Sequence, residues 1–411
     1  MNILLVSGLS DFGGVEIEVE LLAKLARDCG YSVHVLSTSY IKKSSYIYQK
    51  LSNEEGIVLD SMTDYFHKTI IGKIFHFLVK VKFFNKGVDF FELDREPYGY
   101  RFAKKYRMSF WKNKLGKELI KKSDKVILVG QPLNIFEGLL ISAKNENKPL
   151  YFRITGTVLS SHISNQLYKI FLSNINIVKK IIVHSKLNKN NILQYLHYNG
   201  EIDIIDQFVL EEEEYLSIKK IKKNDDVFIV GTMARFSKEK CIDDIIKAFY
   251  LFHINNTNSI LYIAGDGEEK ESLKKLVIEL GIKEKVIFLG YIQDKAKIDF
   301  FKTIDVFIIS SKFETGPITG VEAMAASLPI ISTFVGAMPE RLQNIEKDFF
   351  YEVGDIEKLS EYIRVIFDMS LDERLKIGEK NRKVYMKYYS KKNILSLYKK
   401  SILEDTKGFN L

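Results

Sequence analysis

Two acidic and two basic side chains in the second half of the chain are the strongest candidates for chemistry. Glu314 and Glu322 are separated by seven residues, and Glu322 falls early in a predicted helix. Arg235 and Lys240 lie in a loop that precedes another predicted helix. Carboxylates accept hydrogen bonds from hydroxyl groups, whereas an Arg fork and a Lys ammonium suit a diphosphate. A nucleotide sugar, which carries both kinds of group, therefore fits this set. An acid at a helix N-terminus would explain one glutamate, but not the basic pair.

A second candidate site lies near the start of the chain. Gly13 and Gly14 follow the strand-length apolar run Ile3–Val6 and precede a helical pattern. Glycines at a helix N-terminus let an anion approach the backbone and its free N–H groups. A glycine doublet is also typical of a simple tight turn, so this interpretation stays open.

Alternating strand and helix patterns position both candidate sites. The expected strands of the first half are Ile3–Val6, Val33–Leu36, Lys125–Val129, Pro149–Ile154 and Lys180–Val183. Those of the second half are Val227–Val230, Ile260–Ala264, Val286–Leu289, Asp305–Ile309 and Pro329–Ser332. This order predicts an α/β fold with two doubly wound domains. The candidate residues come just after strand ends, where such sheets bind ligands.

The expected domain boundaries follow from composition. Residues 206–226 contain the acidic run Glu211–Glu214 and a Lys-rich stretch, which are typical of a linker. We therefore predict an acceptor-binding domain over 1–206 and a donor-binding domain over 207–388. Residues 389–411 have helical apolar spacing and are predicted to pack back on the first domain.

Seven motifs in the second half resemble the large retaining glycosyltransferase family of GT-B fold. In chain order they are Gly231-x-x-x-Arg235-Phe-Ser-x-x-Lys240, Ile263-Ala-Gly-Asp-Gly-Glu268, Val286-x-Phe-Leu-Gly290, Asp305-Val-Phe-x-x-Ser310, Glu314-x7-Glu322-Ala-Met-Ala, Leu328-Pro-Ile-Ile and Gly336-x-x-Pro-Glu340. The start, Gly13-Gly-Val-Glu16, resembles the family's first phosphate loop. The resemblance implies two Rossmann-like domains that face each other across a cleft.

The resemblance also implies a role for each candidate residue. Arg235 and Lys240 would hold the donor diphosphate, Glu322 the ribose hydroxyls, and Glu314 the transferred sugar. The remaining donor contacts would come from Gly13 and Gly14 in the first domain, from the backbone of Thr315, Gly316, Pro317 and Ile318, and from Tyr291 beside the base. No metal and no other cofactor would be needed, because cations and helix N-termini neutralise the leaving group. Asp266 is then a turn residue.

The sequence departs from the family pattern at three places. The family commonly has a His after the strand that corresponds to Pro149–Ile154, and none follows here. Arg153 or Thr155 would fill that role on the acceptor side, whereas His162 and His184 are expected to be structural. Cys241 stands where Gly is usual, and Asp206-Gln207 stands where the family has Asn-Gly.

Composition and charge narrow the class of protein. The 411 residues are 46% hydrophobic and 28% charged, which is typical of a globular protein. Two cysteines exclude a disulfide framework and a Cys-based zinc site. Residues 1–200 hold 29 basic and 17 acidic side chains, a net charge of +12, against −4 for residues 201–411. Nucleic acid is not an expected partner, because no nucleic-acid-binding motif is present. An anionic membrane surface fits the basic half better, although a Lys-rich solvated surface also explains it.

The aromatic and basic segment 65–120 bears on membrane contact. Lys73, His76 and Lys80 would form one polar stripe on a helix that is otherwise apolar. Such a helix either lies in a membrane interface or packs its apolar face into the core. Targeting and membrane-spanning segments are not expected, so the predicted location is the cytoplasm, at the inner face of the cytoplasmic membrane.

The sequence thus predicts a metal-independent retaining glycosyltransferase. It would move a sugar from a nucleotide diphosphate sugar, with uridine as the expected base, to a lipid-linked or polysaccharide acceptor in capsule, lipopolysaccharide or other bacterial surface glycan synthesis. The absent His motivates an alternative, a non-catalytic nucleotide-sugar-binding subunit of a glycosyltransferase complex. A nonspecific nucleic-acid binder would explain only the charge of +14 over residues 101–200.

Overall fold

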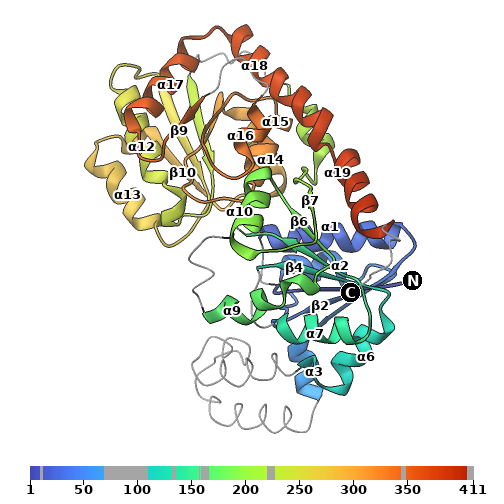
Figure 1. The fold of residues 1–411 in the computed structure, drawn as a ribbon. Coiled ribbons are helices and arrows are strands. Elements are labelled where there is room, and N and C mark those ends of the chain that lie inside the picture. Colours follow the sequence, from blue (N-terminus) through green and yellow to red (C-terminus); the bar gives the residue numbers. More distant parts are fainter. Residues whose placement is uncertain are drawn as a thin grey trace, which may run out of the picture. The chain divides into compact units, whose positions relative to one another are not determined.

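The computed structural model describes residues 1–9, 13–68, 110–131, 136–156, 158, 166–219, 227–343 and 349–404. The chain divides into two compact units. Unit 1 comprises Met1–Val183, Asn188–Ile204 and Leu397–Leu411, and unit 2 comprises His184–Leu187 and Ile205–Ser396. Figure 1 shows their elements, and each unit is an α/β structure built on a parallel sheet.

Unit 1 contains a seven-stranded sheet in the order β3-β2-β1-β4-β5-β6-β7, with parallel pairing throughout. The strands are β1 (Asn2–Ser7), β2 (Ser32–Ser37), β3 (Ile57–Ser61), β4 (Lys125–Gly130), β5 (Leu150–Ile154), β6 (Lys180–Val183) and β7 (Glu201–Ile204). The central strands are mostly apolar and almost entirely buried, as expected for a sheet covered on both faces.

Helices connect these strands. They are α1 (Gly14–Asp28), α2 (Tyr46–Leu51), α3 (Met62–Lys68), α6 (Lys114–Lys122), α7 (Glu137–Asn145), α9 (Gln166–Ser173) and α10 (Lys186–Leu196). Helix α1 forms because Val19, Leu22, Ala23 and Ala26 recur on one stripe, and all four are buried. The free N–H groups at the start of α1 are those of the predicted phosphate loop.

Unit 2 contains a six-stranded parallel sheet in the order β10-β9-β8-β11-β12-β13. The strands are β8 (Phe228–Met233), β9 (Ser259–Ala264), β10 (Val286–Gly290), β11 (Val306–Ile309), β12 (Ile330–Thr333) and β13 (Phe350–Tyr351). The helices are α11 (Glu212–Ser217), α12 (Ile242–His253), α13 (Lys270–Glu279), α14 (Asp294–Thr303), α15 (Ile318–Ala325), α16 (Met338–Leu342), α17 (Ile356–Asp368), α18 (Leu371–Val384) and α19 (Lys391–Tyr398). The predicted fold class, two doubly wound α/β domains, is confirmed.

The strand order of unit 2 reverses between β8 and β11. The chain runs outward from β8 to β10 and then returns to place β11 on the other side of β8. Ligands bind at such a reversal, outside the carboxyl ends of the two central strands. The loop after β8 carries Arg235 and Lys240, the loop after β11 carries Glu314, and Glu322 lies in the helix that follows that loop.

The end of the chain belongs to unit 1 from Leu397 onward. The Tyr398 hydroxyl donates a hydrogen bond to Glu18 of α1, and the Ser401 hydroxyl donates to Asp203 of β7 at 2.6 Å. The Lys125 ammonium donates to the carbonyl oxygens of Ile402 and Leu403 at 2.7 and 2.6 Å. These contacts hold residues 398–403 against the sheet of unit 1.

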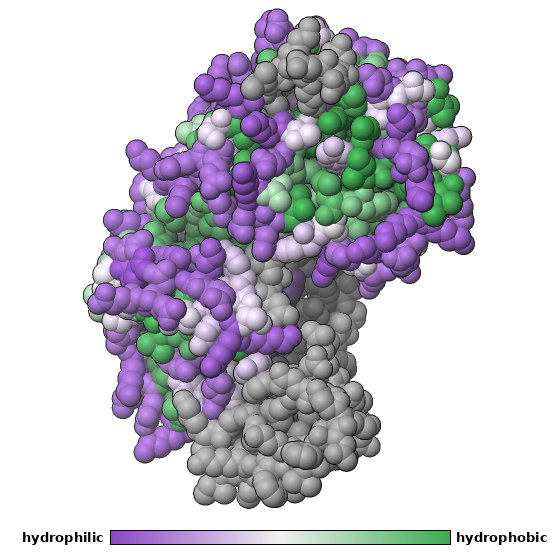
Figure 2. All heavy atoms as spheres, turned by 180° about the vertical axis from the view of Figure 1, so that it is seen from behind, coloured by the Kyte–Doolittle hydropathy of each residue, from purple (hydrophilic) through white to green (hydrophobic). Residues whose placement is uncertain are grey.

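Among the residues that Figure 2 colours, hydrophilic ones alternate with hydrophobic ones, which gather most densely in the upper part of the view. Within the described ranges, no helix combines the length and the apolar character needed to cross a bilayer. The predicted helix with Lys73, His76 and Lys80 lies outside the described residues, as does His162. Membrane contact by this segment therefore stays a prediction.

Candidate functional site

Lys240 and Glu314 meet beside the carboxyl ends of β8 and β11. The Lys240 ammonium forms an ion pair with Glu314, and the two side chains are 15% and 21% exposed. Two further hydrogen bonds join their loops. The Ser310 hydroxyl donates to the Lys240 carbonyl at 2.6 Å, and the Lys312 backbone N–H donates to the Glu239 carbonyl at 2.8 Å. The structure thus brings one predicted basic residue and one predicted acid into a single polar cluster.

Arg235 lies in the same loop but is far more exposed. Its side chain is 73% exposed, and its guanidinium is 3.1 Å from a carboxylate oxygen of Glu239. A surface ion pair of this kind contributes little to stability. The Arg235 guanidinium can therefore exchange Glu239 for a phosphate at small cost.

The Gly265-Asp-Gly267 turn packs directly against the loop that contains Arg235. A side chain at Gly265 would place its Cβ 1.9 Å from the Ala234 carbonyl oxygen, and φ is +136° there. The Phe236 backbone N–H donates to the Asp266 carbonyl at 2.9 Å. The Asp266 carboxylate accepts from Gly267 N–H at 2.8 Å and pairs with Lys270 at 2.6 Å. Asp266 thus lies in a turn, and the described residues contain no group of three or more potential metal-ligating side chains.

The segment Thr315–Pro317 leads directly into α15, which begins at Ile318. The turn at Gly336, where φ is +53°, packs so closely that a Cβ there would lie 2.6 Å from the Thr315 carbonyl oxygen. The Arg341 guanidinium donates to the Pro317 carbonyl at 2.6 Å. The N–H groups in the first turn of α15 have no partner in the α-helical ladder, although that of Gly320 donates to the Pro317 carbonyl at 3.0 Å.

Glu322 lies inside unit 2, one turn into α15. Its side chain is 4% exposed and forms an ion pair with Lys297 of α14. Its second carboxylate oxygen is buried and has no hydrogen-bond partner among the described residues. Burial raises the pKa of Glu322, and the Lys297 ammonium opposes that shift. Glu314 and Glu322 thus pair with different lysines, Lys240 and Lys297, and the shared crevice predicted for the two acids stays a prediction.

We expect Glu322→Gln to flatten the dependence of stability on pH. A carboxyl whose pKa is higher in the folded state binds more protons when folded, so the wild type loses stability as the pH rises above the ordinary value of 4.5. Lys297, Tyr215 and Glu211 face this group, and glutamine keeps an oxygen for Lys297. Urea unfolding at several pH values from 4 to 8 measures the difference. Parallel curves for the two proteins would show that Glu322 has no raised pKa.

Gly13 and Gly14 form the start of α1 in unit 1. Gly14 is exposed, and a Cβ placed there would meet no atom within 4 Å. The backbone at the helix N-terminus is therefore open to a ligand. The residues just before Gly13 lie outside the described ranges. The predicted contact of Gly14 with a donor diphosphate stays a prediction.

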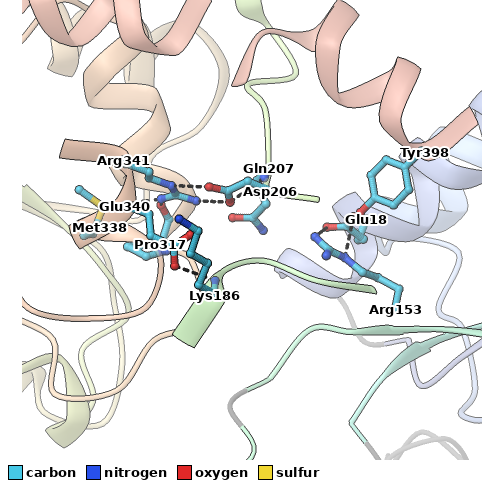
Figure 3. A network of polar contacts seen from close by, with 10 residues as sticks. All are labelled: Glu18, Arg153, Lys186, Asp206, Gln207, Pro317, Met338, Glu340, Arg341 and Tyr398. Atoms are coloured by element: carbon cyan, nitrogen blue, oxygen red, sulfur yellow. Dashed lines mark hydrogen bonds and ion pairs between the residues drawn. The ribbon is translucent and has the colours of Figure 1, made fainter. Parts of the chain in front are cut away.

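The two acceptor-side candidates differ in exposure. Arg153 is fully buried, with its Nε 3.1 Å from a carboxylate oxygen of Glu18 and its guanidinium 5.6 Å from the centre of the Tyr398 ring (Figure 3). Thr155 is half-buried, and its N–H donates to the Gly130 carbonyl at 3.2 Å. His184 is buried. A role for Arg153 at the acceptor stays a prediction, and it would require the Glu18 pair to open.

Tyr291 comes directly after β10 and is 55% exposed. This position at a strand end suits a ring that stacks on a base. Cys241 has φ +48°, in the left-handed region that favours glycine. That backbone conformation explains why glycine is usual at this place in the family.

Three residues of this region were not predicted from the sequence. Lys297 pairs with Glu322, and Arg341 and Asp206 form a buried ion pair next to the Pro317 loop. The motif Gly336-x-x-Pro-Glu340 indicated the turn at Gly336. It gave no indication that the next residue, Arg341, is buried.

Comparison with known proteins finds a family match within unit 2. Residues 214–384 match the family of glycosyl transferases group 1. The chain is 29% identical over 230 residues to alpha-monoglucosyldiacylglycerol synthase of Acholeplasma laidlawii, covering 52% of this chain and 56% of the relative. It is 28% identical over 209 residues to the capsular polysaccharide biosynthesis glycosyltransferase CapM of Staphylococcus aureus, covering 50% and 54%. The matches thus span little more than half the length of these relatives.

A solved structure shares the fold of the whole chain. The crystal structure of Anabaena HepE in complex with UDP superposes with a TM-score of 0.71 at 15% identity, covering 98% of this chain and 99% of the other. The matched residues 214–384 lie within unit 2 and contain the Lys240–Glu314 cluster. Residues 214–384 thus form a region of the glycosyl transferases group 1 type, in a chain whose two doubly wound units have the GT-B fold.

Proposed function

We propose that this protein is a retaining glycosyltransferase that takes its sugar from a UDP-sugar. The observation that carries the proposal is the Lys240–Glu314 cluster at the strand-order reversal of unit 2, next to the first turn of α15. Lys240 and Arg235 would hold the diphosphate, and the N–H groups of the Thr315–Ile318 segment would add donors. Positive groups fixed at this place stabilise the negative charge that develops on the leaving phosphate.

Glu314 would contact the transferred sugar once the diphosphate takes its place beside Lys240. The ion pair already holds this partly exposed carboxylate beside Lys240, so a sugar attached to a phosphate bound by Lys240 would lie within its reach. The unpartnered oxygen of Glu322 would accept a ribose hydroxyl. Because Lys240, Arg235 and the helix N-terminus supply the positive charge, we propose that turnover needs no metal.

The acceptor is proposed to be lipid-linked or a polysaccharide. The similar Acholeplasma protein is named as a synthase of alpha-monoglucosyldiacylglycerol, a glycolipid, and the similar Staphylococcus protein is named for capsule synthesis. Residues 101–200 carry a net charge of +14, which suits an anionic membrane surface or a diphosphate-linked acceptor. We therefore propose work at the inner face of the cytoplasmic membrane in bacterial surface glycan synthesis.

A non-catalytic donor-binding subunit is the second candidate. Two observations favour it: the family's His is missing from the first domain, and its proposed substitute Arg153 is fully buried in a pair with Glu18. Such a subunit would bind a nucleotide sugar and turn it over only when a partner protein is added.

A thermal-shift screen with UDP-, GDP- and ADP-sugars tests the donor, because a ligand that binds only the folded state raises Tm. The ligand that stabilises the protein is then incubated with it in EDTA, and release of the nucleoside diphosphate is measured. We expect a UDP-sugar to raise Tm and to be hydrolysed slowly in EDTA. Binding without release would favour the subunit, and loss of release in EDTA alone would contradict the metal-independent mechanism.

A further inference from the structure

Arg341 and Asp206 form a buried ion pair in unit 2. The Arg341 side chain is fully buried, and that of Asp206 is 8% exposed. The guanidinium donates two parallel hydrogen bonds to the carboxylate, from Nε to Oδ2 at 2.8 Å and from Nη2 to Oδ1 at 2.6 Å (Figure 3). This bidentate geometry fixes both groups in direction as well as in distance.

The same guanidinium holds the loop that leads into α15. Its Nη1 donates to the Pro317 carbonyl at 2.6 Å. A Cβ at Gly316 would lie 2.9 Å from Arg341 Nη2 and 3.3 Å from Asp206 Oδ1. The Gly316 backbone therefore rests directly on the ion pair, and any shift of the pair moves the loop.

Asp206 lies two residues beyond the end of β7, where the chain has just entered unit 2. The neighbour of Arg341, Glu340, accepts a hydrogen bond from the Lys186 N–H at 2.6 Å, in the short segment His184–Leu187 of unit 2. Glu340 and Arg341, which are consecutive in α16, thus bind two separate segments of unit 2. Glu340 binds His184–Leu187, and Arg341 binds the start of Ile205–Ser396.

Stability alone does not explain this pair. Burying two charges carries a desolvation cost that their attraction often fails to exceed, and a well-packed apolar pair is frequently as stable. The pair does fix the orientation of the loop, because one planar guanidinium bonds to the Asp206 carboxylate on one side and to the Pro317 carbonyl on the other. Positioning the loop is therefore the role that its geometry supports.

We propose that Arg341 and Asp206 are positioning residues for the diphosphate part of the donor site. They set the place of Thr315–Pro317 and of the first N–H groups of α15, and they touch neither the nucleotide nor the reacting atoms. The inference rests on the proposed function, since it assigns the pair to the loop that would bind the β-phosphate.

The chain offers a matched control at the other end of the same helix. Arg382 donates from Nε to the Ala325 carbonyl at 2.8 Å, so it too binds a carbonyl oxygen at an end of α15. Arg382 has no role in the proposed donor site. A purely structural effect on α15 would be produced by Arg382→Lys as well as by Arg341→Lys.

The test compares the affinities of the full-length protein for UDP and UMP by calorimetry. The two nucleotides differ only in the β-phosphate, so the ratio of their Kd values reports on the diphosphate part of the site. We expect Arg341→Lys and Asp206→Asn to weaken UDP by about tenfold or more relative to UMP, since small misplacements of binding groups have effects of this size. Arg382→Lys should lower Tm and leave the ratio unchanged.

The outcomes separate the inference from the function on which it rests. An unchanged ratio in both variants, or an equal change in Arg382→Lys, would overturn the positioning role while the wild type still binds UDP. Wild-type protein that binds neither nucleotide would overturn the uridine donor and the inference with it. If Arg341→Lys does not fold, Asp206→Asn decides, because asparagine keeps the shape and one of the two acceptor oxygens.

Discussion

Glu314→Ala is expected to abolish sugar transfer, lowering kcat by about a thousandfold, an effect comparable with the loss of a group that stabilises a transition state. The Glu314 carboxylate is held by Lys240 and is partly exposed, so it would meet a transferred sugar there. Its side chain is partly exposed and lies outside the core of unit 2, so we expect Tm to change by only a few degrees. Transfer to acceptor and slow donor hydrolysis both measure the effect.

A surface acid of the same unit provides the control for Glu314. Glu352 is exposed, so Glu352→Ala should retain wild-type turnover and stability. Glu314→Gln separates charge from shape, and partial activity in this variant would assign the role to hydrogen bonding. Full activity of Glu314→Ala would refute the role that we give to this residue.

Lys240→Met is expected to weaken UDP binding by about 2–3 kcal/mol, roughly 30- to 150-fold, as is typical when one partner of a largely buried charged contact is removed. The Lys240 side chain is 15% exposed, and its ammonium already binds a carboxylate. Little water therefore screens the attraction between its charge and a phosphate that binds there. Methionine keeps the length and the apolar stem of the side chain. Calorimetry with UDP at two salt concentrations measures the loss.

Lys238→Met changes the same charge on the same turn. Lys238 lies two residues before Lys240 and is exposed. A general effect of positive charge on nucleotide attraction would lower affinity equally in both variants and disappear at high salt. We expect Lys238→Met to bind UDP as the wild type does, and equal losses would contradict a specific contact by Lys240.

The sequence predicted the fold because buried parallel strands leave a direct signal. Runs such as Val306–Ile309 are apolar along their whole length, and each is followed by a polar loop and then a helical pattern. Parallel strands carry those loops to one edge of the sheet. Lys240 and Glu314 could therefore be expected together from sequence alone, although they are 74 residues apart.

The unpredicted residues depend on partners that no local pattern reveals. Arg341 follows Pro-Glu in a short helix, where a charged side chain normally faces solvent. Its burial depends on Asp206, 135 residues earlier, whose carboxylate matches its two donors. In the sequence, Lys297 has the pattern of a surface lysine of α14. The structure shows that it pairs with Glu322, 25 residues later. Charge pairing across elements, rather than hydrophobic periodicity, decides where such side chains lie.

Arg153 differs from Lys297 and Arg341, because its residue type and position suggested a functional role from the sequence. The absence of the family's His made a basic residue near the end of β5 attractive as its replacement. The structure gives this guanidinium a carboxylate from α1 and an aromatic ring from residue 398, and both contacts hold it in the interior of unit 1. A residue type that suits a reaction also suits burial when an acid and a ring are available.

The contacts of residues 398–403 with β4, β7 and α1 have a consequence for biosynthesis. About 190 residues separate the end of β7 from Leu397, and all of them belong to the other unit. At about 5–20 residues per second, a ribosome needs roughly 10 to 40 seconds to make that stretch. Unit 1 therefore gains its contacts with residues 398–403 only after unit 2 has emerged from the ribosome and has had time to fold.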